Sequence, residues 1–322
     1  MKFFSLFFSS LLLLFSAVSQ SVPANFDQAK TLAQRLHAPA ANSFYCDCDI
    51  RWQGKKGIPD LASCGYQIRK NGPRANRIEW EHVMPAHHFG HQRQCWQNGG
   101  RKNCVKTDST FRLMEADLYN LVPAIGEVNG DRSNFRFGVL PATEPKHGAC
   151  PVKVDFKQQV FEPGPKVRGD IARIYFYMAD KYQLPLAKAQ QQLFMAWHQQ
   201  DPVDETERKL QQRIAQQMGH ANDFVTGKKV WQLNYKLSGF GLTKAKQTTH
   251  TAAVSALPST EQASGKVLGN KRSKLYHLSH CSGYRQVSER NQQWFDTEQQ
   301  ALNAGFKRAG NCSAEASIGA ED

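Results

Sequence analysis

Two short stretches of the sequence combine residue types that could together hydrolyse a phosphate ester. The first runs from Arg77 to Pro85 and contains Glu81 beside His82, and the second runs from Gly126 to Asn134 and contains Asn129. Such a hydrolysis needs a base to deprotonate water, a hard cation to take up the growing negative charge, and a donor for the product phosphate. Imidazole has an ordinary pKa of about 6.5, which suits the base, so the first stretch points to His82.

Glu81 and Asn129 offer the oxygen ligands that Mg²⁺ prefers, and so small a ligand set leaves room for the water molecules that this ion keeps. Neighbouring residues of a regular strand point to opposite faces, so Glu81 and His82 can serve one site only if the backbone twists or turns there. Pro85 favours the end of a strand nearby. The alternative is that Glu-His is an ordinary surface pair, as this dipeptide is in most sequences.

The helices and strands that would position these residues are predicted to be unevenly distributed along the chain. Apolar residues recur at helical spacing after Phe26, and Pro39 ends that predicted helix. Residues 44–155 show no long periodic segment, which leaves them free to build a site. Three further helices are predicted over 170–183, 186–200 and 204–218, with Asp170 and Asp204 as N-caps and Gly219 as a stop. Their aromatic stripes are expected to lie in the core.

The N-terminus is typical of a cleaved export signal. Lys2 precedes the apolar run 3–18, and small residues follow up to Ser19. A membrane anchor is the alternative, but the run is shorter than the roughly 20 apolar residues that a spanning helix needs. We therefore expect cleavage near Ser19, a secreted or periplasmic protein and no later membrane segment.

All eight cysteines follow the signal, and an oxidising compartment would let them form four disulfides. Cys95 and Cys104 enclose a short glycine-rich loop and are the best candidates for one bridge, while the remaining pairing is open. Zinc is the competing interpretation. The sequence contains no CxxC pair, however, and the cysteines of Cys46-Asp47-Cys48 are too close for the usual zinc knuckle.

The charge of the chain indicates a polyanionic partner. The sequence has 41 Lys and Arg against 28 Asp and Glu, a formal charge of +13. Such an excess attracts phosphates through the release of counterions, whatever the base sequence. A merely basic soluble protein remains the plainer interpretation of the charge alone.

Composition also divides the chain into parts. Residues 1–19 are the predicted signal, 20–225 a first domain, 226–273 a basic flexible linker rich in Gly, Ser, Thr and Lys, and 274–313 a small module with enough aromatic residues for a miniature core.

From about Phe44 to Val225 the sequence resembles the bacterial endonuclease I family of periplasmic and secreted nucleases. The matching motifs are Arg77 to His82, Gly90 to Trp96, Gly99 to Cys104, Gly126 to Asn134 and Arg168 to Arg173. The resemblance implies an α+β fold with a ββα-metal (His-Me finger) core packed against helices. A strand would deliver the base and a following helix the amide ligand.

Carried onto matching positions, the resemblance makes His82 the general base and Glu81 and Asn129 the Mg²⁺ ligands, with Mn²⁺ or Ca²⁺ as substitutes. Arg101 would steady the phosphate, since its planar fork fits two phosphate oxygens better than an ammonium does. The alternative for Arg101 is simple exposure to solvent. The substrates would be DNA, and also RNA, with little sequence preference. We expect a monomer, without a membrane partner, that acts as an endonuclease with deoxyribonuclease activity.

Further basic residues are candidates for contacts to a nucleic-acid backbone, because phosphate recognition needs guanidinium and ammonium donors along a groove. They are Arg93, Lys102, Arg132, Arg136, Arg168 and Arg173. Glu115, Asp117 and Asn120 could support the metal shell or have a purely structural role. A zinc cluster of His87, His88 and His91 with His82 is a weaker hypothesis.

The C-terminal segment lies outside that family resemblance. It resembles small cysteine-containing modules at the ends of other extracellular nucleases, some of which look like the zinc-binding segment of DNA-repair methyltransferases. A bridge between Cys281 and Cys312 is the simpler expectation, and a Cys/His zinc site with His277 and His280 is the alternative. We expect the module to tether substrate. A catalytically silent nucleic-acid-binding or adhesin-like protein is the competing function class, against which the complete set His82, Glu81, Asn129 and Arg101 argues.

Overall fold

The structure, a computed structural model, describes residues 22–39, 42–242, 267–278, 281, 283–295 and 298–310. The chain divides into two compact units, residues 1–247 and 248–322, and each is described by itself. The predicted signal at 1–19 lies outside the described residues. Among those described, no helix has the length and apolar character that a membrane crossing requires.

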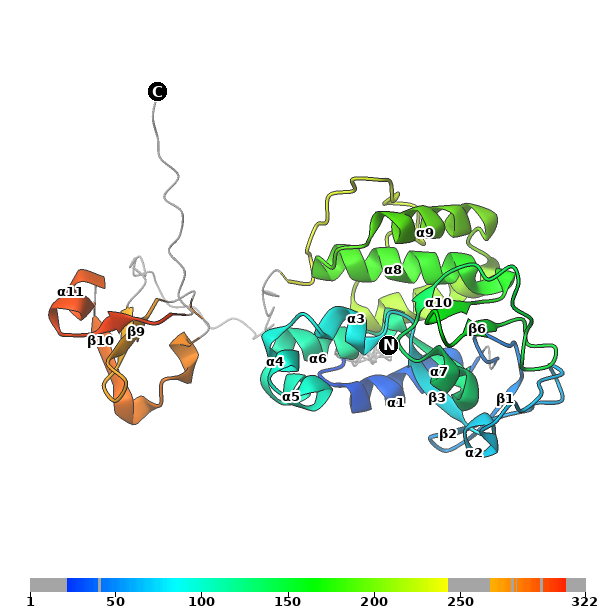
Figure 1. Cartoon of the computed structure of the whole chain (residues 1–322), viewed down its shortest axis with the longest axis horizontal. Helices are drawn as coiled ribbons and strands as arrows, with labels where there is room; N and C mark the ends of the chain where they lie inside the picture. The colour runs from blue at the N-terminus through cyan, green and yellow to red at the C-terminus, as the bar shows by residue number, and fades with distance from the viewer. Residues whose placement is uncertain are drawn as a thin grey trace, which may run out of the picture. The chain divides into compact units, whose positions relative to one another are not determined.

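The first unit contains a pair of antiparallel strands followed at once by a helix; Figure 1 labels the first strand, β3, and the helix, α7. Strand β3 (Ile78–His82) pairs with β4 (Leu121–Ile125), so that Glu81 lies opposite Val122 and His82 opposite Leu121. Helix α7 (Gly126–Arg132) begins directly after β4 and packs against both strands. Three of the four residues predicted for catalysis and metal binding lie on this β3-β4-α7 unit: Glu81 and His82 on β3 and Asn129 on α7.

Short elements fill the segments around this unit. Strands β1 (Ile50–Gln53) and β2 (Lys56–Pro59) form a hairpin, and α2 (Gly72–Ala75) leads into β3. Between β3 and β4 lie α3 (Ala86–Gly90), α4 (Gln94–Gln97), α5 (Gly100–Thr107), α6 (Ser109–Glu115) and the 3₁₀ turn η1 (Leu118–Asn120). A three-stranded sheet follows, in the order β5 (Arg136–Phe137), β7 (Val160–Glu162), β6 (Lys153–Asp155). The fold is therefore mixed α+β, as predicted.

The four predicted helices of this unit are present. They are α1 (Phe26–His37), α8 (Arg168–Tyr182, preceded by the 3₁₀ turn η2, Pro165–Val167), α9 (Lys188–Gln200) and α10 (Glu205–Met218). Asp204 caps α10 by accepting from Glu207 N at 2.7 Å, and Gly219 ends it with φ at 72°, both as predicted. Asp170 is not a cap, because α8 begins two residues earlier, and it pairs with Arg173 instead.

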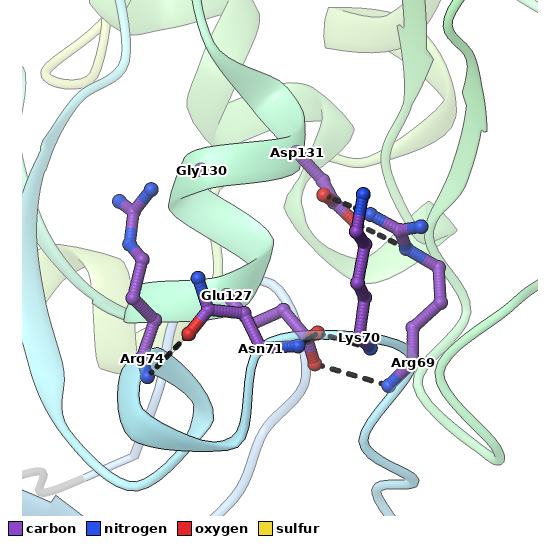
Figure 2. Close-up of a pocket in the computed structure, with 7 residues that line it drawn as sticks. All are labelled: Arg69, Lys70, Asn71, Arg74, Glu127, Gly130 and Asp131. Atoms are coloured by element: carbon purple, nitrogen blue, oxygen red, sulfur yellow. Dashed lines mark hydrogen bonds and ion pairs between the residues drawn. The ribbon is translucent and has the colours of Figure 1, made fainter.

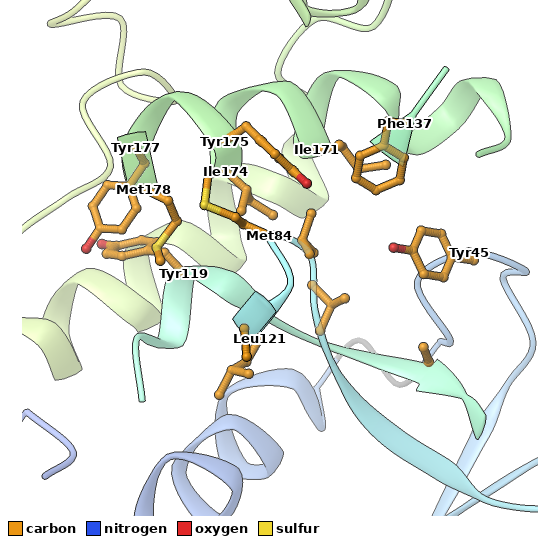
Figure 3. Packing of buried hydrophobic residues seen from close by; sticks show 14 of the residues in the cluster. Tyr45, Met84, Tyr119, Leu121, Phe137, Ile171, Ile174, Tyr175, Tyr177 and Met178 are labelled. Atoms are coloured by element: carbon orange, nitrogen blue, oxygen red, sulfur yellow. The ribbon is translucent and has the colours of Figure 1, made fainter. Parts of the chain in front are cut away.

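The main core lies where α8 crosses the β3-β4 pair. Figure 3 shows Ile174, Tyr175 and Met178 of α8 on the side that faces Leu121 of β4. Phe194 and Trp197 of α9 add a second aromatic layer, with Phe194 4.5 Å from Tyr175 between ring centroids. The aromatic stripes of the helices are thus core, as expected from their spacing.

The predicted linker begins later than expected. Residues 226–242 lie in the first unit, where Trp231 is 7% exposed and stacks on Phe176 at 4.7 Å. Asp180 of α8 accepts from Ser238 N at 2.6 Å and pairs with Lys229. A few aromatic residues in a polar stretch are enough to dock it on α8, which corrects the boundary at 226. Residues 243–266 lie outside the described residues.

The second unit begins before the predicted module. Its four-stranded sheet has the order β10 (Gln292–Phe295), β8 (Val267–Asn270), β9 (Leu275–His277), β11 (Lys307–Arg308). The unit also contains α11 (Glu298–Asn303) and the 3₁₀ turns η3 (Tyr284–Gln286) and η4 (Glu289–Asn291). Because β8 is internal to the sheet, the module starts by Val267 and not at 274. Val267, Tyr276, Phe295 and Phe306 form the expected small core.

Three disulfides hold the first unit together. Cys95 pairs with Cys104, as predicted, and the other two bridges are Cys46 to Cys150 and Cys48 to Cys64. The bridge from Cys46 joins segments 104 residues apart and fixes the loop that contains Tyr45. Cys281 is also disulfide-bonded, but Cys312 lies outside the described residues, so the predicted partnership of these two stays a prediction.

Candidate active site

His82 is the last residue of β3, where the chain leaves the strand, and its side chain is buried. Its Nε2 lies 2.8 Å from the main-chain oxygen of Glu115, and its ring lies 4.7 Å from that of Phe26. Burial, aided by the charge of Arg101, lowers the pKa of His82 to about 4, against the raising effect of the Glu115 carbonyl. The imidazole is therefore neutral at neutral pH and can accept a proton.

Asn120 fixes the chain just after His82. Its amide donates to Met84 O at 2.9 Å and accepts from Met84 N at 2.7 Å, and its own main-chain oxygen accepts from Val83 N. This double hydrogen bond sets the direction in which the backbone leaves β3. Asn120 thus has a structural role, one of the two that the sequence left open.

Arg101 reaches the same region from the first turn of α5. Its Nε donates to Glu115 Oε1 at 2.6 Å, and its guanidinium carbon lies 5.4 Å from the centre of the Phe26 ring. The Arg101 side chain is 44% exposed, whereas that of Glu115 is 4% exposed. Glu115 therefore holds Arg101 with its carboxylate and His82 with its main-chain oxygen.

Glu81 points to the other side of β3, toward α7. It is 3% exposed, accepts from the Tyr45 hydroxyl at 3.0 Å, and lies 3.7 Å from Arg132 Nε. Burial raises the pKa of Glu81 to about 7, although Arg132 and Tyr45 oppose that shift. The raised pKa means that Arg132 and Tyr45 do not fully offset the cost of burying the negative charge of Glu81. A hard cation would stabilise the ionised form of this carboxylate.

Asn129 lies on α7 and faces the same side of β3. Its Nδ2 donates to Glu79 Oε2 at 2.9 Å, and Glu79 shares a strand face with Glu81 because the two are two residues apart. At the β3–α7 interface Asn129 therefore contacts Glu79 directly, and Glu81 lies on the same strand face as Glu79. The oxygens of Glu81 and of the Asn129 amide are the hard donors that suit Mg²⁺.

The described residues contain no group of three or more His, Cys, Asp or Glu arranged to hold a metal ion. His87 and His91 stack at 4.6 Å, and His88 Nε2 lies 2.9 Å from Asn134 O. Asp117 is buried and accepts from Lys181, Tyr177 and Tyr182, which gives it a structural role in anchoring the segment next to Glu115.

The residues predicted to contact a nucleic-acid backbone divide into two groups by their exposure to solvent. Lys102 and Arg136 are exposed, and Arg93 and Arg168 are partly exposed and paired with Asp108 and Glu162.

Arg132 and Arg173 belong to the other group, because both are 0% exposed. Arg132 donates to Val83 O, and Arg173 pairs with Glu207 and Asp170. A guanidinium enclosed by the protein does not reach a phosphate outside it, so these two are removed from the candidates. The sequence could not show that they were buried.

A cleft of about 310 Å³ opens beside α7 (Figure 2). Glu127 organises its floor by accepting from the main-chain nitrogens of Arg69, Lys70 and Asn71. Asp131 forms a two-pronged pair with Arg69. The lining residues are Arg69, Lys70, Asn71, Arg74, Glu127, Gly130 and Asp131, and Gly130 is the sequence neighbour of Asn129.

Sequence comparison relates this chain to known nucleases. The family model for Endonuclease I matches residues 24–228, and a model described as ArfC matches residues 246–308. Endonuclease-1 of Buchnera aphidicola (strain APS) is 50% identical over 201 residues, which cover 62% of this chain and 80% of the relative. An extracellular deoxyribonuclease of Aeromonas hydrophila is 53% identical over 202 residues, covering 62% and 88%. A periplasmic deoxyribonuclease of the same species is 49% identical over 213 residues, covering 64% and 89%.

These matches identify the class as a nuclease, a hydrolase of nucleic-acid backbones. The chain belongs to the endonuclease I family, whose match covers more than half of it. It carries in addition a C-terminal unit that the Endonuclease I match does not include.

Two residues next to the site, Tyr45 and Glu79, were not named as candidates from the sequence. Tyr45 holds Glu81 from a loop 36 residues away, which no local pattern could show. Glu79 could have been found, because strand alternation places it on the same face as Glu81.

Proposed function

We propose that this chain is a secreted or periplasmic endonuclease that hydrolyses DNA and RNA with little sequence preference, as a monomer, using Mg²⁺ or its substitutes Mn²⁺ and Ca²⁺. The names of its relatives include extracellular and periplasmic deoxyribonucleases, which supports the compartment and the substrate. The charge of +13 supports recognition through phosphates and not through bases.

The observation that carries the mechanism is the contact between His82 Nε2 and Glu115 O. A carbonyl oxygen only accepts, so Nε2 carries the hydrogen and Nδ1 keeps the lone pair. In this mechanism Nδ1 of His82 takes a proton from the attacking water. The Glu115 contact holds the ring in the tautomer and orientation that this step requires.

Glu81 and Asn129 are proposed to hold the Mg²⁺ ion, within a ββα-metal core made of β3, β4 and α7. The ion would supply positive charge for the phosphoryl and leaving oxygens. Arg101 binds a phosphate oxygen with the part of its fork that Glu115 does not use. Exposed Lys102 and Arg136, with Arg93 and Arg168, steer the substrate backbone toward the site.

A plasmid-nicking assay tests the proposal directly. Supercoiled DNA should be nicked in Mg²⁺, nicking should stop with a chelator, and Mn²⁺ should restore it. A labelled RNA in the same assay tests the second substrate. Binding to DNA without any nicking in Mg²⁺, Mn²⁺ or Ca²⁺ would instead favour the silent nucleic-acid-binding class.

We further propose that the C-terminal unit tethers substrate. Trp294 on the edge strand β10 is 51% exposed and lies 5.9 Å from Tyr284 between ring centroids. Exposed cations accompany it on this unit: Lys271, Arg272, Lys274, Arg290 and Lys307. An exposed aromatic ring on a unit that also carries exposed cations suits a nucleic acid, whose bases stack and whose phosphates pair. A second weak site raises the local concentration of substrate without new contacts at the catalytic residues.

A further inference from the structure

Glu79 is the meeting point of three donors at the β3–α7 interface. Arg74 donates to it from Nε at 3.0 Å and from Nη2, and Arg77 donates from Nε at 2.9 Å and Nη2 at 2.7 Å. The third donor is Asn129 Nδ2, at 2.9 Å from Oε2. The Glu79 side chain is 20% exposed, and those of Arg74 and Arg77 are 32% and 53% exposed. The mechanism proposed above makes no use of this carboxylate.

The contact with Glu79 decides which way the Asn129 amide faces. An amide can present either its nitrogen or its oxygen to a neighbour, but an ionised carboxylate has only acceptors to offer. Both oxygens of Glu79 accept from the guanidiniums of Arg74 and Arg77. Glu79 therefore acts as an acceptor here, and the nitrogen of Asn129 faces it. The oxygen then points away from Glu79, and among the described residues it accepts no hydrogen bond.

We infer that Glu79 is a positioning residue that presents the Asn129 oxygen to the divalent cation, an inference that rests on the proposed role of Asn129. Without Glu79, the two orientations of the amide become similar in free energy, and one of them turns a donor toward the ion. Groups that orient a ligand in this way commonly change metal affinity about 10- to 100-fold when they are removed.

Arg74, which donates to Glu79, passes close to Gly130 of α7. A Cβ added at Gly130 would clash with Arg74 Nη1 and lie 2.7 Å from its guanidinium carbon. Figure 2 shows the Arg74 side chain rising beside Gly130 on the helix. Glycine at 130 therefore leaves the space in which Arg74 reaches Glu79. Gly130→Ala should displace only the flexible end of Arg74, so it disturbs Glu79 without removing any group that contacts Asn129.

Metal binding by the full chain, without substrate, tests the inference. Mn²⁺ affinity is measured by titration calorimetry and by the shift in Tm that Mn²⁺ causes. We expect Glu79→Gln and Glu79→Ala to weaken Mn²⁺ binding about 10- to 100-fold, and Gly130→Ala to weaken it less. Glu144→Gln, at an exposed position, is the matched control and should bind Mn²⁺ as the unmodified chain does.

A compensating pair separates positioning from general stability. Asn129→Asp alone places two carboxylates face to face and should bind Mn²⁺ poorly. In the double variant with Glu79→Gln, the new amide at position 79 can donate to the new carboxylate at position 129. This hydrogen bond turns the other oxygen of that carboxylate toward the ion. The double variant should bind about tenfold or more tightly than Asn129→Asp alone, within the usual range for such orienting groups. A double variant no better than Asn129→Asp overturns the inference.

Asn129→Ala distinguishes the ligand role of Asn129 from the positioning role of Glu79. Normal Mn²⁺ binding by Asn129→Ala would remove the ligand role in the proposed function, and the inference with it. Weak binding by Asn129→Ala together with normal binding by Glu79→Gln would remove only the positioning role and leave the proposed function intact.

Discussion

Arg101 Nε lies 2.6 Å from Glu115 Oε1, on the same residue whose main-chain oxygen lies 2.8 Å from His82 Nε2. One buried residue at the end of α6 thus holds both the proposed base and the proposed phosphate ligand. The segment after it is anchored by Asp117, which accepts from three side chains of α8. The relative position of base and guanidinium therefore depends on α8 as well as on β3 and α5.

His82→Ala should lower the nicking rate by roughly 10² to 10⁴, the usual effect of losing a general base. The fold should survive, because the ring contributes one hydrogen bond and contacts at the edge of the core. Nicking rates in saturating Mg²⁺ measure the effect, and circular dichroism checks folding. His91→Ala, at a partly exposed histidine that follows α3, serves as control. Unchanged cutting by the folded His82→Ala protein would show that another group is the base.

Glu115→Gln should lower the rate about 10- to 100-fold, because it removes a charge-assisted hydrogen bond from Arg101 but keeps the carbonyl that holds His82. Arg101→Lys should act similarly, since an ammonium cannot bridge the carboxylate and a phosphate with a planar fork. Because both changes act on one interaction, the double variant should be little worse than either single one. Fully multiplicative effects on the rate would contradict a shared role.

The pair of Arg93 and Asp108 should make stability depend on pH. Burial tends to raise the pKa of Asp108, but Arg93 and the amide of Phe111 lower it overall below its ordinary 3.8. A carboxylate with a lowered pKa stabilises the fold fully above pH 3.8 and loses that effect as the pH falls through its folded-state pKa.

Asp108→Asn keeps the helix cap but not the charge, so it should cost about 1 to 2 kcal/mol of unfolding free energy at neutral pH. The difference from the unmodified chain should shrink as the pH falls below 3.8. Urea unfolding across that pH range measures it, with exposed Glu144→Gln as control. A difference that is constant with pH would show that packing, not charge, is lost.

The tether predicts an effect that depends on substrate length. Trp294→Ala, or truncation after residue 247, should raise KM for long DNA while leaving kcat unchanged, because only the second site is lost. A duplex too short to reach both units should be cut equally by all variants. Leu302→Ala removes another exposed apolar side chain of this unit and is the control. Equal KM values for long DNA would exclude the tether.

Local patterns predicted the helices and the central motif but not the contacts that complete the site. The period of the apolar residues gave α1, α8, α9 and α10, and Asp204 and Gly219 mark the ends of α10. The prediction of Asp170 as an N-cap was wrong because an acidic residue in the first turn of a helix looks the same in sequence as one just before the helix. The family motifs supplied His82, Glu81, Asn129 and Arg101.

What could not be predicted depends on tertiary structure. The contact of Tyr45 with Glu81 spans 36 residues, and that of His82 with Glu115 spans 33. Arginine is mostly exposed in proteins, so nothing in the sequence marks Arg132 and Arg173 as buried. The segment after 226 looks like a linker because its composition is polar, yet Trp231 docks on Phe176.

Arg132 has a consequence for how the enzyme is handled. Its guanidinium is enclosed, lies 4.3 Å from the centre of the Phe137 ring, and stands next to Glu81. The positive charge of Arg132 offsets part of the Glu81 charge, and we expect the fold to keep its shape without a bound ion. The protein should therefore tolerate storage in EDTA and regain full cutting as soon as magnesium is returned, without a refolding step.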